Sequence, residues 1–300
     1  MIQTYHDGSA DRAKTFAAII ADYSDLSAIR NHPIPEYNVT TADGEVTDEC
    51  YRRNASFRMG FHSLKDATDL TDYGWQEGSD KGSAVSLSLE GTIAAVEAIR
   101  QRPVWGDSGD SLCTDRALRG DWDIAFQSSG RVRTNGSKIV TLVGAFGGHC
   151  NRTTEELFWN GIQIVVTADI LENAGYQCEI IGGNNNYQSR SGTIGFAGIV
   201  AKCAGDPLRI DQIASVFAHA GVFRTIGFEM IVRTPTEVGC GLGNPRMSVG
   251  EMTLSVRKLE AAGLLPSDSI IIGEAYDQKS AIKNIRATLH AVTGELPVAA

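Results

Sequence analysis

One segment of the chain, residues 139–181, constrains the fold more than any other. The apolar run 139–143 predicts a buried strand, and a glycine-rich turn follows it. The pattern over 153–173 predicts a long helix that ends at Gly175, and residues 176–181 predict a second strand. A strand–helix–strand unit of this kind forms a right-handed crossover between parallel strands. We therefore expect an α/β protein, with an α+β arrangement as the alternative.

The remaining segments predict a mixed sheet flanked by helices. Residues 193–202 predict a strand that forms a hairpin with 176–181 through a long polar loop, residues 182–192. Further strands are predicted at 124–127, 228–233 and 269–272, and further helices at 11–23, 63–70, 83–102, 208–219, 251–262 and 277–292. Ser63 and Asp66 form a capping-box pattern, and 31–60 is interpreted as an irregular arm. We divide the chain into a mainly helical N-terminal region, residues 1–102, and an α/β core, residues 103–300.

Composition favours a folded cytoplasmic protein. Of 300 residues, 42% are hydrophobic and 21% charged, which excludes a chain disordered throughout. No apolar run approaches the roughly 20 residues that cross a bilayer, and the first residues lack a signal-peptide pattern. The six cysteines are scattered without a C-x-x-C pair, which is typical of reduced thiols. We expect no membrane association.

The charge distribution is uneven. The net charge of −9 argues against a nucleic-acid partner. However, residues 124–154 and 180–205 contain no Asp or Glu, and we call them the acid-free segments. They carry six positive charges, which leaves −15 on the rest of the chain. A locally basic surface on an acidic body is therefore possible.

The glycine-rich turn at residues 144–148 carries none of the usual ligand motifs. A P-loop needs a Gly-Lys-Ser/Thr triplet, and a dinucleotide site needs G-x-G-x-x-G; neither follows this strand. A metal-dependent adhesion site needs Asp-x-Ser-x-Ser there, but the sequence reads Gly-Ala-Phe-Gly-Gly. We interpret the turn as one that the fold requires, and expect neither a cofactor nor a bound metal.

Two groups of residues could support catalysis. His149 and Cys150 are adjacent, but neighbouring residues rarely place both side chains in mutual hydrogen-bond geometry. Five spaced aspartates could bind a cation or act as acids and bases, although such residues commonly cap turns: Asp107, Asp110, Asp115, Asp121 and Asp123. A cation-dependent hydrolase is thus the weakest hypothesis, and we predict that the protein is not an enzyme.

Basic residues interleaved with aromatic ones point to single-stranded nucleic acid. Cations can follow the phosphates while aromatic rings stack on bases, at about 1–3 kcal/mol for each stacked base. The candidate phosphate ligands are Arg131, Arg133, Lys138 and Arg190, with Tyr187 as the stacking residue and Arg52, Arg53 and Arg58 assisting from the arm. Solvated loops are the alternative interpretation of the same segments.

Four segments carry a resemblance to known proteins: residues 63–78, 103–120, 173–181 and 202–226. Their Trp, Gly and Asp-Pro patterns resemble a family of bacteriophage- and prophage-encoded proteins of unassigned biochemistry. This resemblance implies an intracellular phage product of the host cytoplasm, with an α/β core similar in outline to a von Willebrand A domain that lacks its metal ligands. In its size, the chain is also similar to the single-stranded-DNA-binding RNA polymerase cofactors of N4-like phages. That likeness implies a factor that recruits a phage RNA polymerase.

Two functional hypotheses follow. The first is a non-enzymatic phage protein that binds single-stranded DNA, acts as an accessory factor in phage transcription, and contacts the phage RNA polymerase. The alternative is a metal-free, A-domain-like protein-interaction or virion-associated module. Either protein could form a homo-oligomer.

Overall fold

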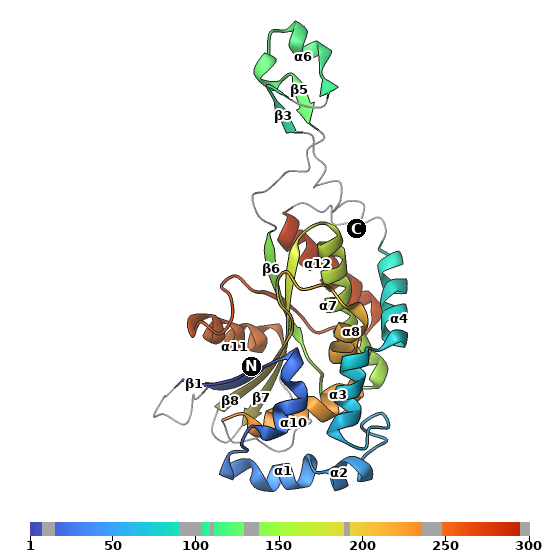
Figure 1. Ribbon diagram of the computed structural model, residues 1–300, viewed down its shortest axis with the longest axis vertical. Helices are drawn as coiled ribbons and strands as arrows, with labels where there is room; N and C mark the ends of the chain where they lie inside the picture. Colours follow the sequence, from blue (N-terminus) through green and yellow to red (C-terminus); the bar gives the residue numbers. More distant parts are fainter. Residues whose placement is uncertain are drawn as a thin grey trace.

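A six-stranded mixed sheet with helices on both faces forms the body of the protein (Figure 1). The computed structural model describes residues 1–7, 16–89, 104–108, 111–128, 138–188, 193–235 and 248–294. In sheet order the strands are β1 (Ile2–His6), β2 (Phe16–Asp22), β8 (Thr193–Lys202), β7 (Gln177–Gln188), β6 (Ile139–Ala145) and β9 (Ile270–Ile272). The predicted α/β class is confirmed.

The predicted strand–helix–strand unit is present. Strand β6 pairs in parallel with β7, with Ile139 opposite Gln177, and helix α7 (Thr154–Asn173) connects them. A capping box between Thr153 and Glu156 begins α7, and Gly175 follows its end with a φ of 85°. Strand β8 then pairs antiparallel with β7, which confirms the hairpin.

Side chains along the strands alternate between two cores. In β2, Ile19 and Ala21 belong to the larger core, which also contains buried residues of α7, α8 and α10. Phe16, Ala18 and Ile20 belong to the smaller core beneath α11. Because successive side chains of a strand point to opposite faces, one strand contributes to both cores. The sheet is therefore a middle layer, with α11 on one side and the other long helices on the opposite side (Figure 1).

The helices differ greatly in length. Within the described residues up to 89 they are the 3-10 turns η2 (Tyr23–Asn31) and η3 (Glu36–Asn38), and helices α1 (Val39–Glu45), α2 (Asp48–Arg53), α3 (Leu64–Tyr73) and α4 (Gln76–Leu87). Those after α7 are α8 (Ile210–Ala218), α9 (Ala220–Val222), the π-helix η5 (Phe223–Gly227), α10 (Phe228–Arg233), α11 (Val249–Ala261) and α12 (Gln278–Thr293). The predicted capping box of α3, between Ser63 and Asp66, is confirmed.

A second, three-stranded sheet lies apart from the first (Figure 1). Its strands, in order, are β3 (Val104–Gly106), β5 (Phe126–Ser128) and β4 (Ser111–Leu112), accompanied by α6 (Thr114–Leu118) and η4 (Trp122–Ile124). The predicted strand at 124–127 corresponds to β5. Among its described side chains Ala125 is buried, whereas Leu118 and Trp122 are exposed.

The helix predicted at residues 11–23 is wrong for its second half. Residues 16–22 form β2, and every side chain from Phe16 to Ala21 is buried. A strand covered on both faces reads as a continuous apolar run, which periodicity alone cannot distinguish from a buried helix. Residues 8–15 lie outside the described part of the chain.

The flexible loop predicted at residues 182–192 is wrong for its first seven residues, because β7 continues to Gln188. Two of its buried asparagines have tertiary hydrogen bonds: Asn184 Nδ2 donates to the carbonyl of Phe146 at 3.2 Å, and Asn185 Oδ1 accepts from Ser255 Oγ at 2.7 Å. Tertiary partners therefore bind polar side chains that, in sequence alone, are typical of a loop.

Residues 228–233, predicted as a strand, form the helix α10 instead. It continues directly from α9 through the π-helix η5, and every residue of this stretch is buried. Because every side of this helix is buried, apolar residues occur on all of its faces. The sequence therefore lacks the 3.6-residue periodicity of an amphipathic helix. The predicted irregular arm at 31–60 contains the short helices α1 and α2, and α4 begins at Gln76, earlier than predicted.

The expected boundary at residue 102 lies outside the described residues. Residues on both sides of it share one sheet, since β2 pairs in parallel with β8. Within the described part of the chain, no single helix is long and apolar enough to span a membrane. The bent pair Ile210–Ala218 and Ala220–Arg233, with an angle of 60° between its halves, meets the length and composition criteria together.

Candidate binding site in an aromatic cavity

A cavity of about 620 Å³ opens among the helices on the face of the sheet opposite α11. Its walls come from the start of α4, the start of α7 and the junction of α8 with α9. The lining residues are Met59, Trp75, Glu77, Lys81, Ala84, Val85, Thr154, Glu155, Phe158, Trp159, Ala218, His219, Ala220 and Gln278. We call this space the aromatic cavity, because four of its lining side chains are aromatic rings.

Trp75 forms one wall from the residue that precedes α4. Its ring lies over the first turn of that helix, where Gly78 leaves room for it: an added Cβ would lie 2.2 Å from Cε3 of the indole. Any larger residue at this position would displace the ring. The glycine thus places the indole at the cavity.

Phe158 and Trp159 form a second wall from α7. Their ring centres are 5.3 Å apart at an interplanar angle of 75°, and Phe158 meets Trp75 at 6.2 Å and 86°. Edge-to-face contacts of this kind suit the quadrupoles of the rings. The walls therefore meet at a corner and do not stack on one another.

His219 completes the aromatic lining at the break between α8 and α9. Its ring stacks on Phe61 at 5.3 Å and lies perpendicular to Trp75 at 4.9 Å. Burial among these rings lowers the pKa of His219 to about 4, with Glu77 opposing the shift. The imidazole is neutral near pH 7, and Nδ1 is buried without a hydrogen-bond partner among the described residues.

Charged groups at the cavity are mostly acidic. Glu77 and Glu155 are exposed on its rim, against one lysine, Lys81. The Lys81 ammonium lies 2.6 Å from Glu77 Oε1 and 5.7 Å from the ring centre of Phe158. This cation already contacts both an aromatic wall and a carboxylate of the cavity.

The glycine-rich turn after β6 is closed by amide side chains. Asn160 Nδ2 donates to the carbonyl of Gly147 at 3.0 Å, and Asn160 Oδ1 accepts from the Ala275 backbone at 3.1 Å. Gly147 has a φ of 88°, in the region that favours glycine. These contacts support the interpretation of a turn that the fold requires. In the described part of the chain no group of His, Cys, Asp and Glu could hold a metal ion.

Arg58, proposed from the sequence as a phosphate ligand, is buried, and that assignment is wrong. Its side chain is 1% exposed, and its guanidinium lies between the rings of Tyr51 and Phe228. A phosphate could not reach it without unfolding this region. Two rings attract the cation inward, and one of them, Phe228, is distant in sequence, so composition cannot reveal the contact.

The sheet topology separates the other proposed contacts. The exposed Lys138 lies beside the start of β7, since its carbonyl accepts from the Gln177 backbone at 3.1 Å. Tyr187 lies ten residues further along the same strand, which places its backbone about 33 Å away at ~3.3 Å per residue. The structure therefore does not bring these two residues together.

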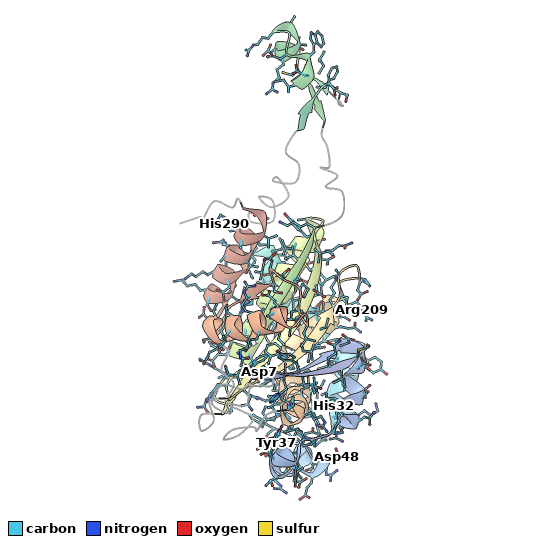
Figure 2. The ribbon with its side chains drawn as sticks, turned by 90° about the vertical axis from the view of Figure 1, so that its left-hand side faces the viewer. Asp7, His32, Tyr37, Asp48, Arg209 and His290 are labelled. Carbon is cyan, nitrogen blue, oxygen red and sulfur yellow. The ribbon has the colours of Figure 1, made fainter. Side chains whose placement is uncertain are left out.

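The remaining nucleic-acid candidates fall into two groups. Arg131, Arg133 and Arg190 lie outside the described residues. Arg52 and Arg53 are exposed on α2, which begins at Asp48, labelled at the lower end of Figure 2. Arg53 pairs there with Glu49 at 2.8 Å, so an acidic neighbour accompanies one of these two cations.

The catalytic candidates do not form a recognisable constellation. Cys150 Sγ lies 3.8 Å from Nδ1 of its neighbour His149, and both are at the surface or close to it. Asp110 lies outside the described residues. The other four aspartates of its group are exposed in the turns and short helices that accompany the small sheet: Asp107, Asp115, Asp121 and Asp123.

A family model matches residues 19–294, almost the whole chain, and its description is "Domain of unknown function (DUF7192)". The chain belongs to this family. No curated protein and no solved structure matches it. The match includes all the residues that line the aromatic cavity, so the DUF7192 domain includes the candidate site.

Sequence reasoning did not identify the aromatic cavity. Trp75, a large aromatic residue in the turn before α4, is one signal in the sequence. The adjacent pair Phe158 and Trp159 near a helix start was a second signal. Neither signal shows that segments more than 80 residues apart converge on one space, which only the packing of α4 against α7 decides.

Proposed function

We propose that this protein is a non-enzymatic protein-interaction module and that the aromatic cavity is its binding site. The observation that carries the proposal is an open space of about 620 Å³ lined by Trp75, Phe158, Trp159 and His219. A pocket of this size has room for a small molecule or for the anchoring side chains of a partner, and tryptophan is enriched where binding energy concentrates.

The chemistry of the lining favours binding over catalysis. Thr154 supplies the one hydroxyl among the cavity-lining residues that are described, and none of them is a cysteine. Thr154 lies on the first turn of α7, and its hydroxyl forms no described hydrogen bond with His219. A nucleophile next to a base is the minimum for covalent catalysis.

Charge favours a protein partner over single-stranded DNA. The cavity rim carries two carboxylates and one ammonium, and the chain as a whole carries −9. Both would repel a polyanion. Of the residues proposed to bind DNA, Arg58 is buried, and the cation Lys138 lies far along the sheet from the stacking candidate Tyr187. Single-stranded DNA binding in phage transcription is therefore the competing outcome of the test.

The test uses peptides selected from a displayed random library against the full-length protein. We expect selected peptides to bind Trp159→Ala at least about tenfold more weakly, which is the loss typical of an interface hot spot. Trp122→Ala is the matched control, because Trp122 is exposed in the small sheet. Fluorescence anisotropy of labelled peptides measures both.

The same assay includes a labelled single-stranded oligonucleotide across a salt series. We expect no change in its anisotropy at physiological salt. Oligonucleotide binding that weakens steeply with salt, together with peptides indifferent to Trp159→Ala, would overturn the proposal and support the nucleic-acid function.

A further inference from the structure

The aromatic cavity combines three features that together select one class of ligand: ring walls, acidic groups at the rim, and an exposed lysine ammonium that already lies beside one of the rings. The first feature is the corner formed by Trp75, Phe158 and Trp159, whose rings meet edge to face. A cation within about 6 Å of the face of such a ring is attracted by its quadrupole, and tryptophan attracts it most strongly. Ring walls therefore favour a positive group beyond what apolar contact alone provides.

The rim adds an electrostatic preference of the same sign. Glu77 and Glu155 are both exposed at the cavity, and the neutral imidazole of His219 places no opposing charge on the wall. An incoming cation would thus meet aromatic faces inside and carboxylates at the entrance. An incoming anion would be repelled by the same carboxylates and by the faces of the rings.

Lys81 shows that an ammonium at the rim can lie beside a ring of the cavity. Its Nζ lies 5.7 Å from the ring centre of Phe158 while it pairs with Glu77 at 2.6 Å. Because Lys81 is exposed and lies one helical turn from Glu77, only side-chain rotation is needed to withdraw it. A ligand cation could take over both contacts.

We infer that the aromatic cavity binds an organic cation, either a quaternary ammonium or the basic side chain of a protein partner, with Lys81 as the internal competitor. The inference rests on the proposed function, since it names the ligand chemistry of the same site. Phe158 and Glu77 hold the ammonium of Lys81 in the free protein and the ligand cation in the complex.

The decisive comparison is between choline and 3,3-dimethylbutan-1-ol, which has the same shape without the charge. Both are titrated into the full-length protein while the indole N–H signals of its tryptophans are followed by NMR. We expect choline to shift the signals of Trp75 and Trp159 and to leave Trp122 unmoved. The uncharged analogue should bind on the order of tenfold more weakly. Equal affinities would overturn the inference.

Substitution of Lys81 gives a second test, in which the variant is expected to bind choline more tightly than the wild-type protein. Lys81→Met should tighten choline binding several-fold, because it frees Glu77 and the face of Phe158. The control is Lys65→Met, which removes the same charge from a similar exposed pair, with Asp69, on α3. It should leave the affinity unchanged. Weaker choline binding to Lys81→Met would contradict the competitor role.

Further probes distinguish a basic side chain from a quaternary ammonium as the ligand. They also distinguish failure of this inference from failure of the proposed function. N-acetylarginine amide in place of choline tests a basic side chain against a quaternary ammonium, and the tighter of the two identifies the source. If indole binds while both cations do not, the ligand class is wrong but the binding site stands. If no probe shifts Trp159 and no selected peptide depends on it, the proposed function fails as well.

Discussion

The guanidinium of Arg58 lies 4.4 Å from the ring centre of Tyr51, in the interior of the protein. Its other face is 5.3 Å from the ring centre of Phe228, and Nη2 donates to the Glu45 carbonyl at 2.5 Å. Burial lowers the pKa of Arg58, and two of its nitrogens have no hydrogen-bond partner among the described residues. This arginine therefore fills the space between two rings, a packing role that its charge alone would not suggest.

Arg58→Ala should lower the free energy of unfolding by about 3 kcal/mol, because it leaves a cavity between two rings and removes a buried hydrogen bond. Chemical denaturation measures the change. Arg52→Ala, on the exposed side of α2, should change stability by less than about 0.5 kcal/mol. A similar effect of both substitutions would contradict the buried position of Arg58.

Glu229 is the centre of a buried ionic network. Its carboxylate is fully buried and accepts from Arg30 Nε at 2.8 Å, from Arg233 Nη1 at 2.5 Å and from the hydroxyl of Tyr51. Glu229→Gln should cost about 3–5 kcal/mol of unfolding free energy, because it leaves the buried Arg233 without its counter-charge. Thermal and denaturant unfolding both report this loss.

The matched substitution for this network is Glu49→Gln, which breaks the exposed pair with Arg53. Exposed pairs contribute about 0–1 kcal/mol because water screens them. If Glu229→Gln were as mild as Glu49→Gln, the network would have to be solvated, in contrast to the buried arrangement described above.

The free energy of unfolding should decrease in acid, because the buried imidazole of His219 resists protonation in the folded state. Burial lowers the pKa of this imidazole from 6.5 to about 4, so between these values the unfolded chain binds a proton that the folded chain does not. The free energy of unfolding should thus decrease from pH 6.5 downward, by about 3 kcal/mol in total once the pH is below 4. Denaturant midpoints across this range measure it.

His219→Gln should remove that part of the pH dependence and leave the contribution of other groups in place. His62→Gln, at an exposed position before α3, is the control and should preserve the wild-type slope. An unchanged slope in His219→Gln would show that the imidazole is accessible to water and titrates in the folded state.

Helices α7 and α8 touch closely at Gly161. A Cβ added there would lie 2.1 Å from the backbone oxygen of Phe217, closer than any relaxed contact. Gly161→Ala should therefore destabilise the protein by about 3 kcal/mol or more, since backbone must move to admit the methyl group. Gly250→Ala in α11 meets nothing within 4 Å and should stabilise it by about 0.5–1 kcal/mol. Differential scanning calorimetry compares the two variants.

Several elements could be predicted from local patterns because their signals are complete within a few residues. The capping boxes at Ser63 and Thr153, the glycine that ends α7 and the apolar run of β6 all specify a local conformation through neighbouring atoms. These features determined the α/β class. They also correctly predicted the parallel pairing of β6 with β7, since the crossover rule needs only element order.

The remaining features depended on partners distant in the sequence. Strand β2 is apolar because both of its faces are covered, Asn184 is buried because a carbonyl of another loop accepts its hydrogen bond, and Arg58 is internal because two rings enclose it. The aromatic cavity exists because α4, α7 and the α8–α9 break meet without filling the space between them. Short-range patterns determine which elements form, whereas burial and the convergence of side chains are properties of the packed layers. For that reason the candidate site was decided by the tertiary structure.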